Sequence, residues 1–483
     1  MADVTVVGAG PNGLAAAVVM ARAGLSVQVR EAADTIGGGS RTKELIEPGH
    51  LHDVCSAVHP MALASPFFRD FELARRVRLI VPELSYANPL SGGRAALAWH
   101  SLERTAEGLG RDGAAYRALM EPLAEHSEAI TDLLMGSLLQ SPPSALRHPA
   151  AALRLGLAVL EQGSPAWNLR FRGEEAPALL TGVAAHPVGR LPSLSSAGAG
   201  TMLSLLAHTV GWPVPEGGSQ AIIEAMADDV RAHGGDILTS SPVTSLDEVR
   251  GSRAVFLDTA PAGLLALASD RLPARYRRSL EQFRYGNGAC KVDFILSEPV
   301  PWSHPDVARA GTVHLGGSRA ETARAERQVA DGFHPDVPYV LTSQPTAFDA
   351  GRAPQGRHIL WAYCHVPAGS DIDMTATITR RIEDFAPGFR DTVIASRATT
   401  AAGLERYNAN YVGGDFGAGA VSLLQMLRRP VVSPSPWRTP LDGVYLCSSS
   451  TPPGPGVHGM GGYHAAQISL QRDFGLPVPS LAA

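Results

Sequence analysis

The hydrophobic pattern at the N-terminus predicts a strand, a helix and a second strand. Asp3 to Val7 is a short run rich in β-branched residues, and Leu14 to Ala23 is rich in alanine and other apolar residues. Ser26 to Glu31 alternates apolar and polar positions and ends in a carboxylate. Runs of this length and composition are typical of a buried strand, a packed helix and a half-buried strand, respectively.

Farther along, the pattern predicts a mostly helical region and then a sheet. Between Ser65 and Gly211 the chain is rich in Leu and Ala, and we expect it to be mostly helical. This region includes Ala114 to Leu139 and Ser144 to Gln162, which are separated by Ser141, Pro142 and Pro143. In the second half, the predicted elements are two strands and a helix, at Ala289 to Leu296, His358 to His365 and Thr375 to Phe385.

Between the first strand and helix lies a glycine turn, made of Gly8, Ala9, Gly10, Pro11, Asn12 and Gly13. In a dinucleotide-binding turn, Gly8 allows the tight bend, Gly10 lets the backbone approach a pyrophosphate, and Gly13 lets the helix pack on the strand. The N-terminus of the helix then offers N–H groups and a positive dipole end to the phosphates. Glu31 follows Gly13 at the distance where an acid binds ribose hydroxyls, which disfavours a 2′-phosphate and hence NADP.

A second glycine-rich loop distinguishes FAD from NAD. It consists of Ile36, Gly37, Gly38, Gly39, Ser40, Arg41 and Thr42. Such a loop lets the backbone come close to the phosphate and ribitol part of a cofactor, and Arg41 supplies a charged donor. Here the sequence resembles the phytoene-desaturase-like branch of the FAD-dependent amine-oxidase and carotenoid-desaturase superfamily.

Three later segments are similar to the same branch: Trp212 to Ser219 with an amphipathic helix from Gln220 to Ala232, Asn408 to Asp415, and Tyr445 to Tyr463. The resemblance implies that a strand after the first segment leads to Val243, whose backbone contacts the adenine. It also implies that the last segment lies against the flavin ring and ribitol. The cofactor contacts expected there are Ser449, Gly456, Val457, His458, Gly459 and Met460.

The resemblance implies an α/β fold in which a Rossmann-type FAD domain carries an inserted α+β substrate domain. The FAD domain is expected from residues 1–64, 212–262 and 438–483, and the substrate domain from 65–211 and 263–437. No other GxGxxG spacing directly follows a β-branched strand run, since those at Gly108 to Gly113 and Gly454 to Gly459 do not. A separate NAD(P)H domain is therefore not expected, and we expect electrons to leave through the active site to a diffusible acceptor, a quinone or dioxygen.

Two residues are candidates for catalysis. Alternation along the predicted strand places Lys291 and Asp293 on one face and Val292, Phe294 and Leu296 on the other. Amine-oxidase relatives often place such a lysine near flavin N5, so we expect Lys291 to act on protons there; the alternative is a surface ion pair. His458 lies inside the flavin-facing segment and is expected to donate to the flavin or the substrate.

Composition and charge limit the kinds of ligand and partner that we expect this protein to bind. The formal net charge is −5, and no run of Lys or Arg suggests nucleic-acid binding. Histidines and cysteines lack metal-ligand spacing, so no metal is expected. The cysteines are far apart (Cys55, Cys290, Cys364 and Cys447), which fits a reduced cytoplasmic protein with non-covalent FAD. No apolar run is long enough for a spanning helix, while peripheral membrane contact and homo-oligomer formation stay open.

The function predicted from these features is a dehydrogenase or desaturase. It would move a hydride between flavin N5 and an apolar substrate, of the polyunsaturated or isoprenoid kind that the resemblance implies. Three alternatives stay open at this point: a redox-neutral isomerase that uses reduced FAD, a flavin amine oxidase, and a flavin-binding protein without catalytic activity.

Overall fold

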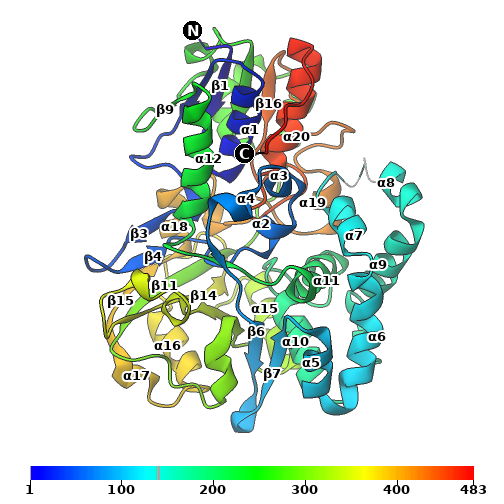
Figure 1. The fold of residues 1–483 in the computed structure, drawn as a ribbon, viewed down its shortest axis with the longest axis vertical. Coiled ribbons are helices and arrows are strands. Elements are labelled where there is room, and N and C mark those ends of the chain that lie inside the picture. The colour runs from blue at the N-terminus through cyan, green and yellow to red at the C-terminus, as the bar shows by residue number, and fades with distance from the viewer. Residues whose placement is uncertain (1, 138, 140–141, 483) are drawn as a thin grey trace.

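Two sheets organise the chain, and helices cover them (Figure 1). The computed structural model describes residues 2–137, 139 and 142–482. The first sheet has five parallel strands in the order β16, β10, β1, β2, β9. Its strands are β1 (Val4–Val7), β2 (Val27–Arg30), β9 (Asp236–Leu238), β10 (Ala254–Leu257) and β16 (Val444–Leu446). All five fall within the three segments predicted to build the FAD domain.

The central strand β1 is fully buried because helices cover both faces of this sheet. On one face, α1 (Pro11–Arg22) packs between α12 (Gln220–Ala232) and α20 (Met460–Ser469). On the other face, the sheet packs against α13 (Pro261–Ala268) and α14 (Ala274–Glu281). The predicted helix from Gln220 to Ala232 is thereby confirmed.

The second sheet has seven strands in the order β15, β11, β14, β13, β12, β6, β7. Neighbouring strands are antiparallel except β12 and β6. Its strands are β6 (Leu84–Pro89), β7 (Ala95–Trp99), β11 (Gly288–Leu296), β12 (Ala310–His314), β13 (Val340–Ser343), β14 (His358–Val366) and β15 (Val393–Thr399). The helix α16 (Thr375–Glu383) covers one face, as the sequence predicts.

The alternation predicted along β11 is confirmed. Val292, Phe294 and Leu296 share one hydrophobic cluster with α16. Lys291 and Asp293 therefore point to the opposite face of the sheet.

A helical region lies beside the second sheet (Figure 1). It contains α5 (Leu102–Gly108), α6 (Gly113–Ala124), α7 (Ser127–Leu134), α8 (Pro142–Arg147), α9 (Pro149–Gln162), α10 (Glu175–Ala184) and α11 (Leu194–Thr209). The helical stretch predicted over Ala114 to Leu139 is divided into α6 and α7, since α6 ends at Ala124, just beyond the helix-interior Pro122. Pro142 begins a helix, where a missing N–H is tolerated, and Ser141 lies outside the described residues.

Short elements connect the two sheets. Two small antiparallel sheets pair β3 (Thr42–Glu44) with β4 (Leu51–Asp53), and β5 (Leu79–Ile80) with β8 (Val214–Pro215). The remaining α-helices are α2 (Pro60–Ala64), α3 (Pro66–Asp70), α4 (Leu73–Arg76), α15 (Arg319–Ala330), α17 (Phe389–Thr392), α18 (Ala401–Tyr407) and α19 (Leu423–Leu427). Across the described part of the chain, no helix combines the length and apolar character needed to cross a membrane.

The strand predicted to lead to Val243 is shorter than expected. β9 ends at Leu238, since Ser240 has a positive φ of 50° and Pro242 cannot donate to a strand ladder. Val243 lies in the following loop, partly buried against the cluster that contains Leu257. Its contact with the adenine stays a prediction.

Candidate active site

The turn between β1 and α1 has the geometry expected of a dinucleotide-binding turn. Gly8 has a φ of +101°, a conformation that favours glycine. A Cβ on Gly13 would collide with the carbonyl oxygen of Gly8, so only glycine lets α1 start this close to the strand. Pro11 occupies the first helical turn, and the N-cap Gly10 has no side chain to cap α1, as expected of a phosphate-binding helix terminus.

Glu31 lies at the carboxyl end of β2 and is 9% exposed. Its Oε2 accepts a hydrogen bond from the Ala9 N–H at 2.8 Å, and its Oε1 accepts one from the Ala33 N–H at 2.9 Å. Oε1 also lies 3.3 Å from Arg41 Nη2, while Oε2 has a further lone pair for a ribose hydroxyl. The acid is thus fixed beside the glycine turn, where the ribose of a dinucleotide is expected.

Sequence reasoning missed Asp258, which follows β10 and meets the same turn. Its Oδ2 accepts a hydrogen bond from the Gly13 N–H at 3.0 Å and lies 2.6 Å from where a Cβ on Gly10 would stand. Burial and, to a smaller extent, the charge of Glu31 raise the pKa of Asp258 to about 7, against the opposing effect of hydrogen bonds from Gly13 and Gly10. No local pattern marks this residue, because β10 and β1 are neighbours only in the folded sheet.

In the second glycine loop, the guanidinium group of Arg41 forms its hydrogen bonds with other protein groups. Its guanidinium donates to the carbonyl oxygens of Thr35, Ile36 and Gly38 and to the Tyr407 hydroxyl, and it lies 3.3 Å from Glu31. Each of its three nitrogens therefore has a protein partner, which fixes the loop. The expected donation from Arg41 to a cofactor phosphate stays a prediction that this geometry does not support.

The glycines of this loop leave room for backbone and for an aromatic side chain. Gly37 and Gly38 have φ values of +118° and +56°. A Cβ on Gly39 would collide with the hydroxyl of Tyr411. Ser40 is buried, and Thr42 donates to Asp53 Oδ1 at 2.7 Å. Tyr411 lies in the segment that resembles the family, but its place beside the loop was not predicted.

The C-terminal loop before α20 is held in place by other parts of the chain. Gly456 and Gly459 have φ values of +135° and +68°. The Ser449 carbonyl accepts from the buried Arg429, Val457 packs against the core around α1, and Met460 begins α20. This loop therefore ends in a helix N-terminus, as expected of a loop that faces a flavin.

His458 is occupied within this loop. Its Nδ1 accepts a hydrogen bond from the Met460 N–H at 3.0 Å, and its Nε2 lies 3.1 Å from the Gly454 carbonyl oxygen, to which it donates. Burial lowers the pKa of His458 to about 4. The neutral ring has no nitrogen left over, so the geometry does not support the expected donation from His458 to flavin or substrate; the histidine holds the loop instead.

The Lys291 and Asp293 pair is buried, so the surface ion pair considered above is excluded. Their side chains are 4% and 1% exposed, and Lys291 Nζ lies 2.6 Å from both carboxylate oxygens of Asp293. His52 Nδ1 lies 3.3 Å from Asp293 Oδ1, and neither ring nitrogen of His52 has another hydrogen-bond partner among the described residues. Sequence reasoning missed His52, which β4 brings onto this sheet.

Cys55 connects this ion pair to the second glycine loop. Its Cβ lies 3.5 Å from the Cβ position of Gly39, and its thiol is hydrogen-bonded with Tyr411. Burial raises the pKa of Cys55, while Tyr411 and the charge of Lys291 oppose that shift. Tyr363 pairs with Lys291 across the β11–β14 ladder and shares a hydrophobic cluster with Cys55 and Tyr411, so the sheet face that carries Lys291 meets the loop expected to hold the flavin.

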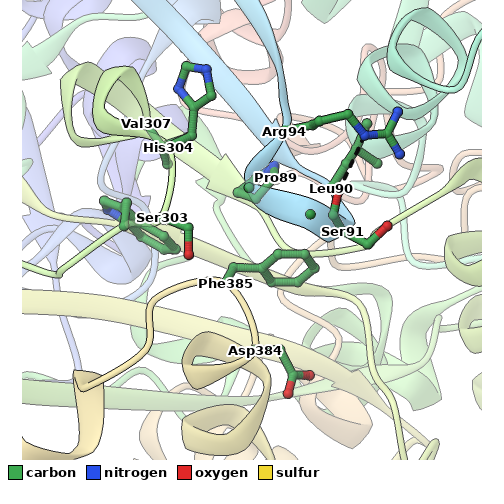
Figure 2. A pocket seen from close by; sticks show the side chains of 12 residues that line it. Pro89, Leu90, Ser91, Arg94, Ser303, His304, Val307, Asp384 and Phe385 are labelled. Carbon is green, nitrogen blue, oxygen red and sulfur yellow. Dashed lines mark hydrogen bonds between the residues drawn. The ribbon is translucent and has the colours of Figure 1, made fainter.

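A separate hollow lies at the far end of the seven-stranded sheet, by the β6–β7 hairpin (Figure 2). Arg94, Ser303, His304 and Phe385 line it, and its volume is about 40 Å³. That volume accommodates a few water molecules at most. It is not part of the site described here.

Comparison with known proteins agrees with this geometry. Residues 12–459 match the family of flavin containing amine oxidoreductases. The chain is 27% identical to the rat (Rattus norvegicus) pyridine nucleotide-disulfide oxidoreductase domain-containing protein 2, over 96% of this chain and 93% of that protein. It is 25% identical to an uncharacterized protein of Mycobacterium tuberculosis, over 97% of both chains.

Solved structures share the fold. An oxidoreductase from Methanosarcina mazei aligns with a TM-score of 0.61 and 15% identity, over 97% of this chain and 100% of that one. Putrescine oxidase bound to putrescine aligns with a TM-score of 0.60 and 18% identity, over 97% and 98%. The glycine turn, Glu31 and the C-terminal loop fit non-covalently bound FAD, the cofactor predicted from the sequence. The chain therefore belongs to the flavin containing amine oxidoreductase family and is an FAD-dependent oxidoreductase.

Proposed function

We propose that the protein dehydrogenates an apolar substrate by removing a hydride from a C–H bond, and that Lys291 takes part in transferring the accompanying proton. The observation that carries this proposal is the buried Lys291–Asp293 pair on a sheet face where Tyr363 packs in one cluster with Cys55 and Tyr411, next to the second glycine loop. FAD supplies the hydride acceptor in such a reaction. The membership of the chain in a flavin-containing family supports this reaction class.

The residues around Lys291 suit an apolar substrate. Tyr363 pairs with Lys291 across the β11–β14 ladder, and its ring packs against Trp361 and Phe416. Aromatic walls exclude water and favour an apolar or flat substrate over a strongly solvated one. The resemblance to phytoene-desaturase-like proteins points the same way, toward a polyunsaturated or isoprenoid compound.

Within this wall, Asp293 and His52 have positioning roles. Asp293 keeps Lys291 Nζ in one place through two hydrogen bonds of 2.6 Å. An amine held by a buried carboxylate can keep a water molecule in position or pass a proton at Nζ. The Nδ1 of His52 lies 3.3 Å from Oδ1 of the same carboxylate. It would donate to that carboxylate while Lys291 is neutral and able to accept the proton that the substrate releases.

An amine oxidase is the second candidate. It is favoured by the family match itself, and putrescine oxidase has the same fold. A primary or secondary amine would need a neutral nitrogen before hydride removal, and the aromatic side chains around Tyr363 would contact it as readily as an alkene.

Anaerobic mixing of the purified yellow protein with compound libraries tests both candidates. Bleaching of the oxidised flavin by isoprenoids or other polyunsaturated compounds supports the dehydrogenase. Bleaching by amines alone supports an amine oxidase. Turnover that requires prior reduction of the flavin would instead indicate the redox-neutral isomerase. Reoxidation of the bleached protein by dioxygen or by a soluble quinone then identifies the acceptor.

A further inference from the structure

We propose that Asp258 is part of the dinucleotide site and that its carboxyl group takes up a proton when FAD binds. FAD retention would then weaken as the pH rises, through a single group at the N-terminus of α1. The proposal concerns a residue to which neither the sequence motifs nor the family match gives a role.

The geometry places Asp258 where a phosphate is also expected. Its Oδ2 accepts a hydrogen bond of 3.0 Å from the N–H of Gly13, in the first turn of α1, and it lies against Gly10. A dinucleotide fingerprint brings its pyrophosphate to this same helix terminus. An anionic carboxylate and an anionic pyrophosphate would therefore compete for one positive dipole end, whereas a protonated carboxyl would not.

The surroundings offer Asp258 no compensating cation. Among the described residues no Lys, Arg or His forms an ion pair with it. The ionisable groups that face it are Glu31, from the end of β2, and Cys447, from the end of β16. Glu31 forms its own ion pair with Arg41. The side-chain amide of Asn410 donates to the backbone carbonyl of Asp258 and not to its carboxyl group. The charge of Glu31 thus disfavours a second negative charge on Asp258, while the neutral thiol of Cys447 brings no charge that would offset it.

The direction in which FAD affinity changes with pH follows from the linkage between FAD binding and proton binding at Asp258. Burial and Glu31 raise the pKa of Asp258 to about 7 in the protein without FAD. A nearby pyrophosphate raises that pKa further, so the bound state holds more protons than the free state above pH 7. FAD affinity is then constant below about pH 6 and falls as the pH rises through 7. One linked proton sets an upper limit of about tenfold per pH unit.

The first experiment measures the Kd of the apoprotein for FAD by flavin fluorescence, between pH 6.5 and 8.5. We expect the wild-type Kd to rise about five- to 25-fold over this range. Asp258→Asn keeps an oxygen that accepts from Gly13 but cannot ionise, so its Kd should stay level and be the lower of the two at pH 8.5. Cys447→Ala is the matched control and should keep the wild-type slope, because burial and the charge of Asp258 hold the pKa of its thiol well above the ordinary value.

A second measurement uses only the wild-type chain and covers the case in which Asp258→Asn does not fold. Calorimetric titration with FAD at pH 7.5, in buffers of different ionisation enthalpy, counts the protons taken up. Uptake of about half a proton or more is the expected result. A wild-type Kd that does not change with pH, a slope that persists in Asp258→Asn, or zero proton uptake would each overturn the proposal.

Discussion

Burial makes the Lys291–Asp293 pair sensitive to the loss of either partner. Both side chains are almost inaccessible, so removing the amine alone leaves a carboxylate in the protein interior. Breaking a buried pair in this way typically costs about 3–5 kcal/mol of stability. A test of catalysis at this position must therefore separate a lost proton carrier from a damaged fold.

The pair of variants Lys291→Met and Lys291→Met/Asp293→Asn makes that separation. The single variant should lower the melting temperature, and the double variant should recover part of it because no unpaired charge remains. Both should keep FAD absorbance yet slow flavin reduction or reoxidation by roughly 100-fold or more, the size expected for a positioned acid–base group. Wild-type rates of both half-reactions in the double variant would leave Lys291 with a structural role only.

Glu31 allows a second prediction at the same scale. Glu31→Ala removes the charged acceptor expected to bind the ribose, together with the hydrogen bond to the Ala9 N–H. Hydrogen bonds to charged groups are worth about 1.5–3 kcal/mol, so the Kd for FAD should rise about ten- to 150-fold. Titration of apoprotein by flavin fluorescence measures this, with exposed Glu47→Ala as the control. Equal Kd values for the two variants would show that Glu31 does not contact FAD.

At the scale of elements, the local sequence patterns predicted those helices and strands whose bounds depend on nearby residues alone. β1, α1, β2, α12, β11, β14 and α16 were all expected near their observed bounds, because each is set by its own periodicity and by flanking glycines. Asp258, His52, Cys55 and Tyr411 were missed as site residues. Their positions depend on β10 pairing with β1 and on β4 reaching the second sheet, which no window of sequence reports.

The C-terminal loop gives a prediction for one such element. In Gly459→Ala, the new Cβ would lie 2.6 Å from Phe67 Cδ1 and 3.1 Å from Ala15 Cβ, in a backbone with a φ of +68°. The left-handed conformation costs about 1 kcal/mol for a residue other than glycine, and overpacking adds about 1–3 kcal/mol. We therefore expect a clear loss of stability and of FAD.

The matched control is Gly475→Ala, after α20. Gly475 has a φ of +66°, and nothing lies within 4 Å of its Cβ position. This variant should lose only the conformational term, so its melting temperature should fall less than that of Gly459→Ala. Equal losses in thermal unfolding would show that contact with Phe67 does not matter.

At the scale of the whole molecule, the parallel sheet is assembled from distant parts of the chain. β1 lies between β10 and β2, and β16 closes the edge from the C-terminal segment. α20 packs on α1 so closely that a Cβ on Gly462 would collide with the carbonyl oxygen of Asn12. We therefore expect the N-terminal turn to reach its binding geometry only when β16 and α20 are in place.

A chain that ends at residue 437 tests this dependence, since it lacks β16 and α20. Met460, Ala466 and Leu470 are at most 2% exposed, and their removal would uncover the apolar face of α1. We expect the truncated chain to lose cooperative thermal unfolding and near-ultraviolet circular dichroism, even with FAD added. Full-length apoprotein is the control, because it lacks FAD but keeps both elements and should still unfold cooperatively. If the truncated chain binds FAD and unfolds cooperatively, the first glycine turn can form without its C-terminal partner, and the cofactor site is more local than the sheet order implies.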